Sequence, residues 1–184
     1  MGDQASDQTV PFDLDPLVGV MLARRYRVLQ RLRRGGIGDR YLAKDVDNAE
    51  SLAIEVMRID LIGAGVELDE IEAALARIPD ETLVHANIVG VIDCGRCPDE
   101  RLFFAMPWIE KGIDCATWLE LCGPQPPATV ASVLVGAAAG IDAIHQAGRV
   151  HGDVKSANVV LADVAGSEMS VVVDSAFALR TQLW

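Results

Sequence analysis

The chain has 184 residues, of which 51% are hydrophobic, so it is long enough and apolar enough to fold around a core of its own. Its formal net charge of -11 at pH 7 argues against a general nucleic-acid-binding surface and against docking on anionic lipid. We recognise no signal peptide before the four cysteines, so we expect free thiols and a cytoplasmic protein.

The first half of the chain is typical of a small antiparallel sheet. Residues 1–20 are polar and acidic and predict a mobile tail. Apolar side chains at helical spacing predict a helix within residues 67–78. Short segments rich in β-branched and aromatic residues, separated by turn residues, predict strands at 26–32, 39–44, 51–59, 87–92 and 102–106.

The second half becomes helical after Pro107. Residues 128–147 predict a long helix that ends at Gly148. The apolar stretch 128–143 contains Asp142 and is shorter than a bilayer-spanning helix, so we expect a core helix and no membrane span. One apolar stripe of this helix is formed by Val130, Leu134, Ala138, Ile141 and His145.

Residues 151–158, HGDVKSAN, are the most informative segment of the chain. They place Asp153, Lys155 and Asn158 at offsets of two and three residues, directly after the apolar helix. Sixteen residues after Asn158, Asp174 ends a run of three valines. This pattern resembles the catalytic loop and the metal-binding strand of protein kinases.

Other segments resemble the same family in the same order. Residues 31–41 resemble its Gly-rich loop, and residues 52–57 resemble the strand that carries its ATP-gripping lysine. Residues 85–89, HANIV, resemble the HPNIV segment of bacterial Ser/Thr kinases, and residues 106–109 resemble the gatekeeper and hinge. The resemblance covers nearly all of residues 22–180.

The resemblance implies an α+β, protein-kinase-like fold. We expect an N-terminal antiparallel sheet lobe with one helix at 21–107 and an incomplete helical lobe at 108–184. The sequence stops at Trp184, before the activation segment and the later helices of the family, so we expect a truncated kinase, either biological or the result of a frameshift.

The resemblance also assigns roles to the loop residues. Asp153 would be the catalytic base, Lys155 would lie beside the transferred phosphate, and Asn158 and Asp174 would hold Mg²⁺. The alternative is that an inactive homologue retains these residues for hydrogen bonding within the loop. The nucleotide-binding positions that the resemblance implies are Gly35, Gly38, Ala53, Glu55, Met106 and Trp108.

Several of these positions depart from the family pattern. Glu55 replaces the ATP-gripping lysine, and Arg33 replaces the first glycine of the loop. Ser175 and Ala176 follow Asp174 where the family has Phe and Gly. A carboxylate near the phosphates repels them, so we expect ATP and Mg²⁺ to bind weakly or not at all.

Arg40 replaces a valine that packs on adenine in the family. On adjacent antiparallel strands Arg40 and Glu55 should face the cleft together, so we expect an ion pair. Two solvated charges on strands of slipped register are the alternative. The glutamate that pairs with the family lysine has no clear counterpart, since Ile71 occupies its position between Glu70 and Glu72.

Two smaller features remain open. Cys94 and Cys97 have the spacing of a zinc knuckle, although their place on a predicted turn favours a plain turn. His145 and His151 are interpreted as core histidines. The helix at 128–147 is apolar around most of its girth, so we expect a protein partner or self-association there.

The function that follows is a degenerate, inactive Ser/Thr-kinase-like protein that acts by binding, or a remnant of such a protein. An active protein Ser/Thr kinase that transfers the ATP γ-phosphate through Asp153, Asn158 and Asp174 is the first alternative. A structural fragment without any ligand is the second.

Overall fold

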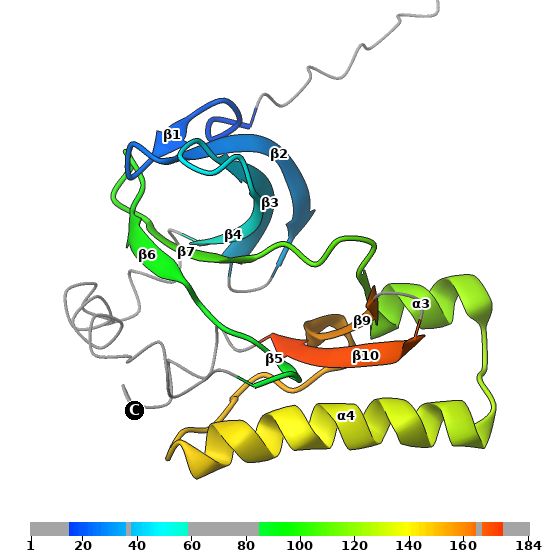
Figure 1. Ribbon diagram of the computed structural model, residues 1–184. Coiled ribbons are helices and arrows are strands. Elements are labelled where there is room, and N and C mark those ends of the chain that lie inside the picture. The colour runs from blue at the N-terminus through cyan, green and yellow to red at the C-terminus, as the bar shows by residue number, and fades with distance from the viewer. Residues whose placement is uncertain (1–14, 36–37, 59–84, 165–166, 175–184) are drawn as a thin grey trace, which may run out of the picture.

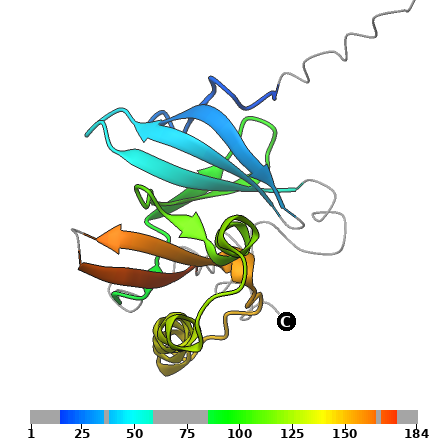
Figure 2. The same cartoon turned by 90° about the vertical axis from the view of Figure 1, so that its right-hand side faces the viewer.

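The computed structural model of the chain describes residues 15–35, 38–58, 85–164 and 167–174, and of residues 163, 164 and 167–174 only the backbone. A curled sheet forms one lobe, and a smaller sheet with two helices lies below it (Figures 1 and 2). This arrangement confirms the α+β fold. The tail 1–14 and the helix expected within 67–78 lie outside the described residues.

The larger sheet has six strands in the order β1-β2-β3-β4-β7-β6, and all neighbours are antiparallel. The sequence predicted four of these strands and missed β1 and β6; β6 pairs with β7 in the segment expected to be a turn around Cys94. The bounds are Met21–Leu22 for β1, Tyr26–Arg34 for β2, Gly38–Asp45 for β3, Ser51–Met57 for β4, Asp93–Arg96 for β6 and Leu102–Pro107 for β7.

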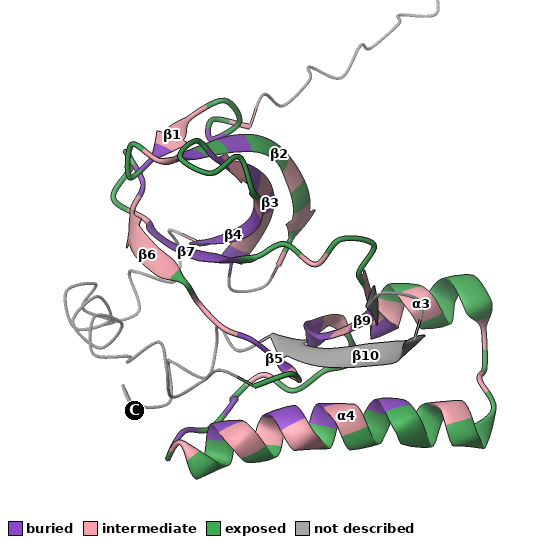
Figure 3. Ribbon diagram, in the orientation of Figure 1, coloured by how far each residue is buried: buried purple, intermediate pink, exposed green. Residues whose placement is uncertain are grey.

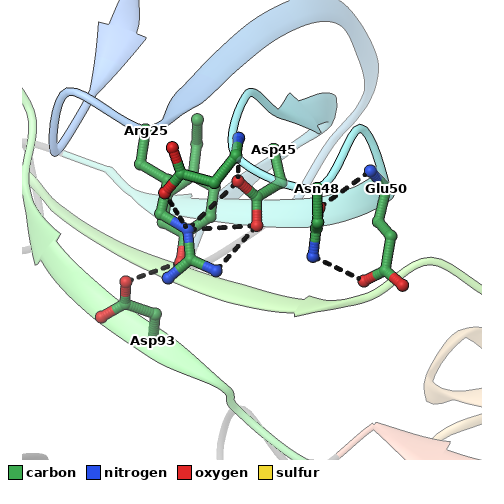
Figure 4. A network of polar contacts seen from close by, with 7 residues as sticks. Arg25, Asp45, Asn48, Glu50 and Asp93 are labelled. Carbon is green, nitrogen blue, oxygen red and sulfur yellow. Dashed lines mark hydrogen bonds and ion pairs between the residues drawn. The ribbon is translucent and has the colours of Figure 1, made fainter.

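A network of polar contacts joins segments of this sheet (Figure 4). The Arg25 guanidinium lies 2.8 Å from the Asp45 carboxylate and 5.1 Å from the centre of the Tyr26 ring. The Tyr26 hydroxyl donates to Asp93 at 2.6 Å and thereby joins β2 to β6. Burial raises the pKa of Tyr26, and the bond to Asp93 raises it further, so the phenol remains a neutral donor.

Packing begins earlier in the chain than expected. Leu17 is 3% exposed and belongs to the core of the larger sheet together with Tyr26 and Tyr41. Asp15 pairs with Arg31 at 2.8 Å and accepts a hydrogen bond from the Tyr41 hydroxyl at 3.2 Å. Residues 15–20, which the sequence assigns to a mobile tail, therefore form part of the folded lobe.

The smaller sheet has the order β5-β10-β9-β8. Its strands are β5 (Ile88–Val89), β8 (Ile113–Asp114), β9 (Val159–Val164) and β10 (Ser167–Asp174). β5 pairs in parallel with β10, although it comes from the segment that the sequence assigns to the first lobe. The chain thus enters the lower layer at β5 and returns to the upper sheet at β6; after Pro107, none of the strands in the described residues belongs to the upper sheet.

Two helices flank the smaller sheet. α3 (Cys115–Cys122) begins at Asp114, whose carboxylate accepts a hydrogen bond from the Thr117 backbone N–H at 3.0 Å. α4 (Pro127–Gln146) packs against β10 with one side and leaves the other side exposed (Figure 3). The buried residues of α4 are Val133, Ala137, Gly140 and Ile144.

The stripe predicted on α4 is therefore not its core face. Leu134 is 62% exposed, Val130 is 38% exposed, and His145 is exposed as well, so its interpretation as a core histidine is wrong. The helix carries apolar residues on several sides, and spacing alone could not distinguish the packed side from the open one.

By length and composition α4 could also cross a membrane, since it has 20 residues and a mean hydropathy of 1.6, and 22% of that stretch is buried. A core helix of a soluble protein meets the same criteria, so the expectation of a core helix without a membrane span stays a prediction. Asp142, which lies within this helix, remains the sequence feature that favours a water-exposed helix.

Candidate functional site

A cavity of about 330 Å³ lies between the larger sheet and the smaller one. Its apolar wall includes Ala53, Val89 and Met106, which form one buried cluster. Trp108, just after β7, lines the cavity as well. The structure thus brings together three of the residues that the resemblance assigns to nucleotide binding. The polar residues that line the cavity are Arg33, Arg40, Asp114 and Thr117.

Arg40 and Glu55 face each other on β3 and β4 and form an ion pair. Arg40 Nη2 lies 2.7 Å from Glu55 Oε2, and the two side chains are 15% and 9% exposed. The expected register and ion pair are confirmed, and the alternative of two solvated charges is wrong. Of the two residues expected to face the cleft, Arg40 lines the cavity and Glu55 is not among the residues that line it.

Gly35 and Gly38 close the turn between β2 and β3. The Gly35 N–H donates to the Gly38 carbonyl at 2.9 Å, and a Cβ atom at Gly35 would approach that oxygen to 2.5 Å. A Cβ atom at Gly38 would lie 2.9 Å from Glu55 Cγ. The hairpin and the Glu55 side chain therefore account for both glycines without a bound phosphate.

The loop after α4 gathers its three polar residues around one carboxylate. Lys155 Nζ lies 2.6 Å from Asp153 Oδ2, and Asn158 Nδ2 donates to the same oxygen at 2.9 Å. Asn158 ends the 3-10 turn η2 (Ser156–Asn158) and is 2% exposed. Burial raises the pKa of Asp153, but the bonds from Lys155 and Asn158 outweigh it and hold the pKa below its usual value.

Two further residues shape this loop. His151 is 1% exposed, and its Nδ1 accepts a hydrogen bond from the Asp153 N–H at 3.2 Å, which confirms it as a core histidine. Gly152 has a φ of 78°, in the left-handed region that favours glycine. Gly152 therefore suits this backbone without strain.

Arg33 of β2 reaches the same loop from the opposite sheet. Its Nη1 donates to the Ala157 carbonyl at 3.3 Å, and its Nη2 donates to Asn158 Oδ1 at 3.4 Å. The sequence identified Arg33 only as a missing glycine and did not predict this contact. The sequence feature that could have indicated this contact was a long cationic side chain in the segment that resembles a nucleotide-binding loop.

Of the two residues proposed to hold Mg²⁺, Asn158 has both ends of its side-chain amide in hydrogen bonds, and Asp174 is described only by its backbone. Asn158 turns its amide nitrogen to Asp153, and its oxygen accepts from Arg33. Asp174 stands opposite Val89 in the pairing of β10 with β5. Within residues 15–35, 38–58, 85–164 and 167–174, no group of three or more His, Cys, Asp or Glu side chains could bind a metal ion.

The cysteines of the described part of the chain take part in no metal-binding group of this kind either. Cys94 lies on β6, and Cys97 is 3% exposed in the core of the larger sheet. Burial and the nearby Asp99 raise the pKa of Cys97 to about 12, so its thiol stays protonated. No disulfide joins the cysteines, all of which lie in the described part of the chain.

Comparisons with known proteins find similar chains among bacterial kinases. The chain is 32% identical over 163 residues to the serine/threonine-protein kinase pkn2 of Myxococcus xanthus, covering 86% of this chain and 19% of that protein. It is 34% identical over 152 residues to PknL of Mycobacterium tuberculosis, covering 81% of this chain and 36% of that protein. The chain thus spans a fifth to about a third of these relatives.

The solved structures agree. The crystal structure of the Mycobacterium tuberculosis PknI kinase domain matches with a TM-score of 0.69 at 27% identity, covering 88% of this chain and 62% of that chain. No protein-family model matches the chain.

Proposed function

Because the chain belongs to the protein kinase superfamily, we propose that it is a degenerate Ser/Thr-kinase-like protein that acts by binding and not by phosphoryl transfer. The observation that carries this proposal is the Arg40–Glu55 ion pair, with 2.7 Å between Nη2 and Oε2. It stands at the position where the family holds its ATP-gripping lysine.

The ion pair weakens phosphate binding in two ways. It removes the ammonium group that the family places at position 55. A carboxylate about 4 Å from a phosphate charge would add a repulsion of about 4 kcal/mol at an effective dielectric constant of about 20. Arg40 offsets this repulsion, but as a neutral pair the two residues do not replace the lost attraction.

The cavity itself favours a binding role. Its volume of about 330 Å³ is near the lower end of the range for small-molecule sites, and its wall at Ala53, Val89 and Met106 is apolar. Such a slot suits a nucleoside-sized, planar ligand more than a triphosphate with two metal ions.

One observation favours the alternative of an active kinase. Asp153 has a lowered pKa and contacts both Lys155 and Asn158, so the loop has its base ionised and its lysine in place. Transfer of radiolabelled γ-phosphate to a protein hydroxyl would support this alternative. We expect no transfer by the natural sequence.

Two measurements test the proposal. Calorimetry with ATP and Mg²⁺ should give a dissociation constant weaker than about 100 µM, equivalent to about -5.5 kcal/mol. A tighter constant or measurable transfer would overturn it. A thermal shift with adenosine, ADP or ATP separates a binding protein from a structural fragment, because a fragment without a ligand site shows no shift with any of them.

A further inference from the structure

Arg33 makes a contact across the cavity that the nucleotide-binding fold does not require. The residue lies on β2, and the two atoms that accept its hydrogen bonds, the Ala157 carbonyl oxygen and Asn158 Oδ1, lie on η2, more than 120 residues later in the chain. The contact spans the cavity that both Arg33 and Ala157 line. It therefore joins the two lobes at the position that the resemblance assigns to a metal ion.

The guanidinium and a divalent cation compete for one atom. Mg²⁺ binds oxygen ligands at about 2.0–2.1 Å and demands near-ideal octahedral geometry. Asn158 Oδ1 is the oxygen it would use, and Arg33 Nη2 already lies 3.4 Å from that atom. A metal ion there would lie within a few ångströms of a fixed positive charge, because an arginine stays protonated at any physiological pH.

The side-chain nitrogen of Asn158 is hydrogen-bonded as well. Its Nδ2 donates to the Asp153 carbonyl and to Asp153 Oδ2, both at 2.9 Å, and the side chain is 2% exposed. The amide cannot turn Oδ1 away from Arg33 without losing the two hydrogen bonds that Nδ2 donates. The orientation that accepts from Arg33 is thus the one that the loop itself stabilises.

We propose that Arg33 is the resident cation of this cleft. Its guanidinium takes the place at Asn158 that a divalent metal ion would occupy, so a phosphate-bearing ligand binds here without metal. An arginine suits this role, because Arg33 lines the cavity and its guanidinium remains charged at any physiological pH, so it attracts phosphate oxygens. The inference deepens the proposed binding function by naming the ligand class and its independence from metal.

The first test measures metal alone and needs no nucleotide. Mn²⁺ is titrated into the full chain and followed by electron paramagnetic resonance for the natural sequence, Arg33→Ala, Arg33→Ala with Asn158→Ala, and Arg27→Ala. Arg27 is an exposed arginine of the same strand and serves as the matched control. Surface carboxylates bind Mn²⁺ weakly in every variant, so the Asn158-dependent part of the signal defines the site.

We expect Arg33→Ala to gain an Asn158-dependent Mn²⁺ site at least tenfold tighter than any in the natural sequence or in Arg27→Ala. Arg33→Gln retains hydrogen bonding without charge and should gain affinity in the same direction. An Asn158-dependent site already present in the natural sequence would overturn the inference. So would its absence from both Arg33 variants, since Arg33 would then not be what excludes the metal.

The second test adds the ligand. ADP is titrated by calorimetry in EDTA and again in excess Mg²⁺. The natural sequence should bind ADP equally well in both, whereas Arg33→Ala should lose at least tenfold in EDTA and recover part of the loss with Mg²⁺. Binding that requires Mg²⁺ in the natural sequence, or no ADP binding at all, would overturn the assignment of a phosphate-bearing, metal-free ligand. Phosphate transfer would overturn the proposed function alone.

Discussion

Replacing Glu55 by lysine should destabilise the protein even though lysine is the residue that the family places there. Glu55→Lys would set an ammonium beside the Arg40 guanidinium, on side chains that are 9% and 15% exposed. At the present 2.7 Å separation and an effective dielectric constant of about 20, Coulomb attraction is about 6 kcal/mol before desolvation.

The net effect is smaller, because both charges lose hydration in the folded protein. Removing one partner of a buried ion pair costs about 3–5 kcal/mol. We therefore expect Glu55→Lys to lower the free energy of unfolding by about 3 kcal/mol. Arg40→Val alone should cost less, since valine fills part of the site, and the double variant should recover most of the loss.

The assay is urea unfolding followed by circular dichroism, with the midpoint and slope reported for each variant. The double-mutant cycle should give a coupling energy of about 1–3 kcal/mol. The Arg96–Glu100 pair, with 3.8 Å between its charged atoms and a 76% exposed glutamate, is the control and should give less than about 0.5 kcal/mol. Equal coupling in both cycles would refute the reasoning.

Other contacts give shorter predictions. Arg149 is 8% exposed, burial lowers its pKa, and its Nη1 has no hydrogen-bond partner in the described part of the chain. We therefore expect Arg149→Met to raise the free energy of unfolding by about 1–3 kcal/mol. A lower free energy of unfolding would contradict this expectation. The bond from Arg25 lowers the pKa of Asp45 in the folded protein. The contribution of Asp45 to the free energy of unfolding is therefore complete above its unfolded pKa of about 3.9 and is lost as the pH falls through its folded pKa. Urea unfolding at a series of acidic pH values should show a weaker pH dependence of stability for Asp45→Asn. We propose that α4 mediates self-association or partner binding through Leu134 and Val135, which are 62% and 71% exposed. Sedimentation of the natural sequence should show species larger than a monomer, and the double variant Leu134→Glu, Val135→Glu should lose them. A monomeric natural sequence would exclude self-association.

Local signals in the sequence were sufficient for β2, β3, β4 and β7 of the larger sheet. Short turns between β2, β3 and β4 fix the register of neighbouring strands, so the pairing of Arg40 with Glu55 followed from position alone. β6 was missed because Cys94-Gly95-Arg96 contains a glycine and lies beside a turn, and such a strand has little propensity of its own.

Two features could not be predicted because they depend on distant parts of the chain. α4 is apolar on several sides, and distant segments decide which side is buried: Val133 packs in one cluster with Val159 and Leu161, and Ile144 packs in another with Ile88 and Leu102, while Leu134 is exposed. The contact of Arg33 with Asn158 joins two lobes across a cavity, and no periodicity of either segment encodes it. Both residues can be read from the sequence, but their contact cannot be predicted from it.

The substitutions around the cavity relocate a positive charge. The family has one lysine at position 55, whereas this chain has Arg33, Arg40 and Glu55, which together carry the same formal charge. Arg40 and Glu55 neutralise each other at 2.7 Å, and Arg33 contacts the loop residue Asn158 at 3.4 Å. The resident cation that we propose, Arg33, therefore lies at the position that the family gives to metal and not at the phosphate-gripping position.

This relocation predicts that the three substitutions act as one unit. A variant with Arg33→Gly, Arg40→Val and Glu55→Lys retains the formal charge and returns it to β4. We expect it to bind ATP with Mg²⁺ at least tenfold more tightly than the natural sequence, equivalent to about 1.4 kcal/mol. Glu55→Lys alone should gain less, because Arg40 repels the new ammonium and Arg33 still occupies Asn158. Calorimetry with ATP in Mg²⁺ and in EDTA measures both effects; equal affinity of the single and triple variants would show that the three positions act independently.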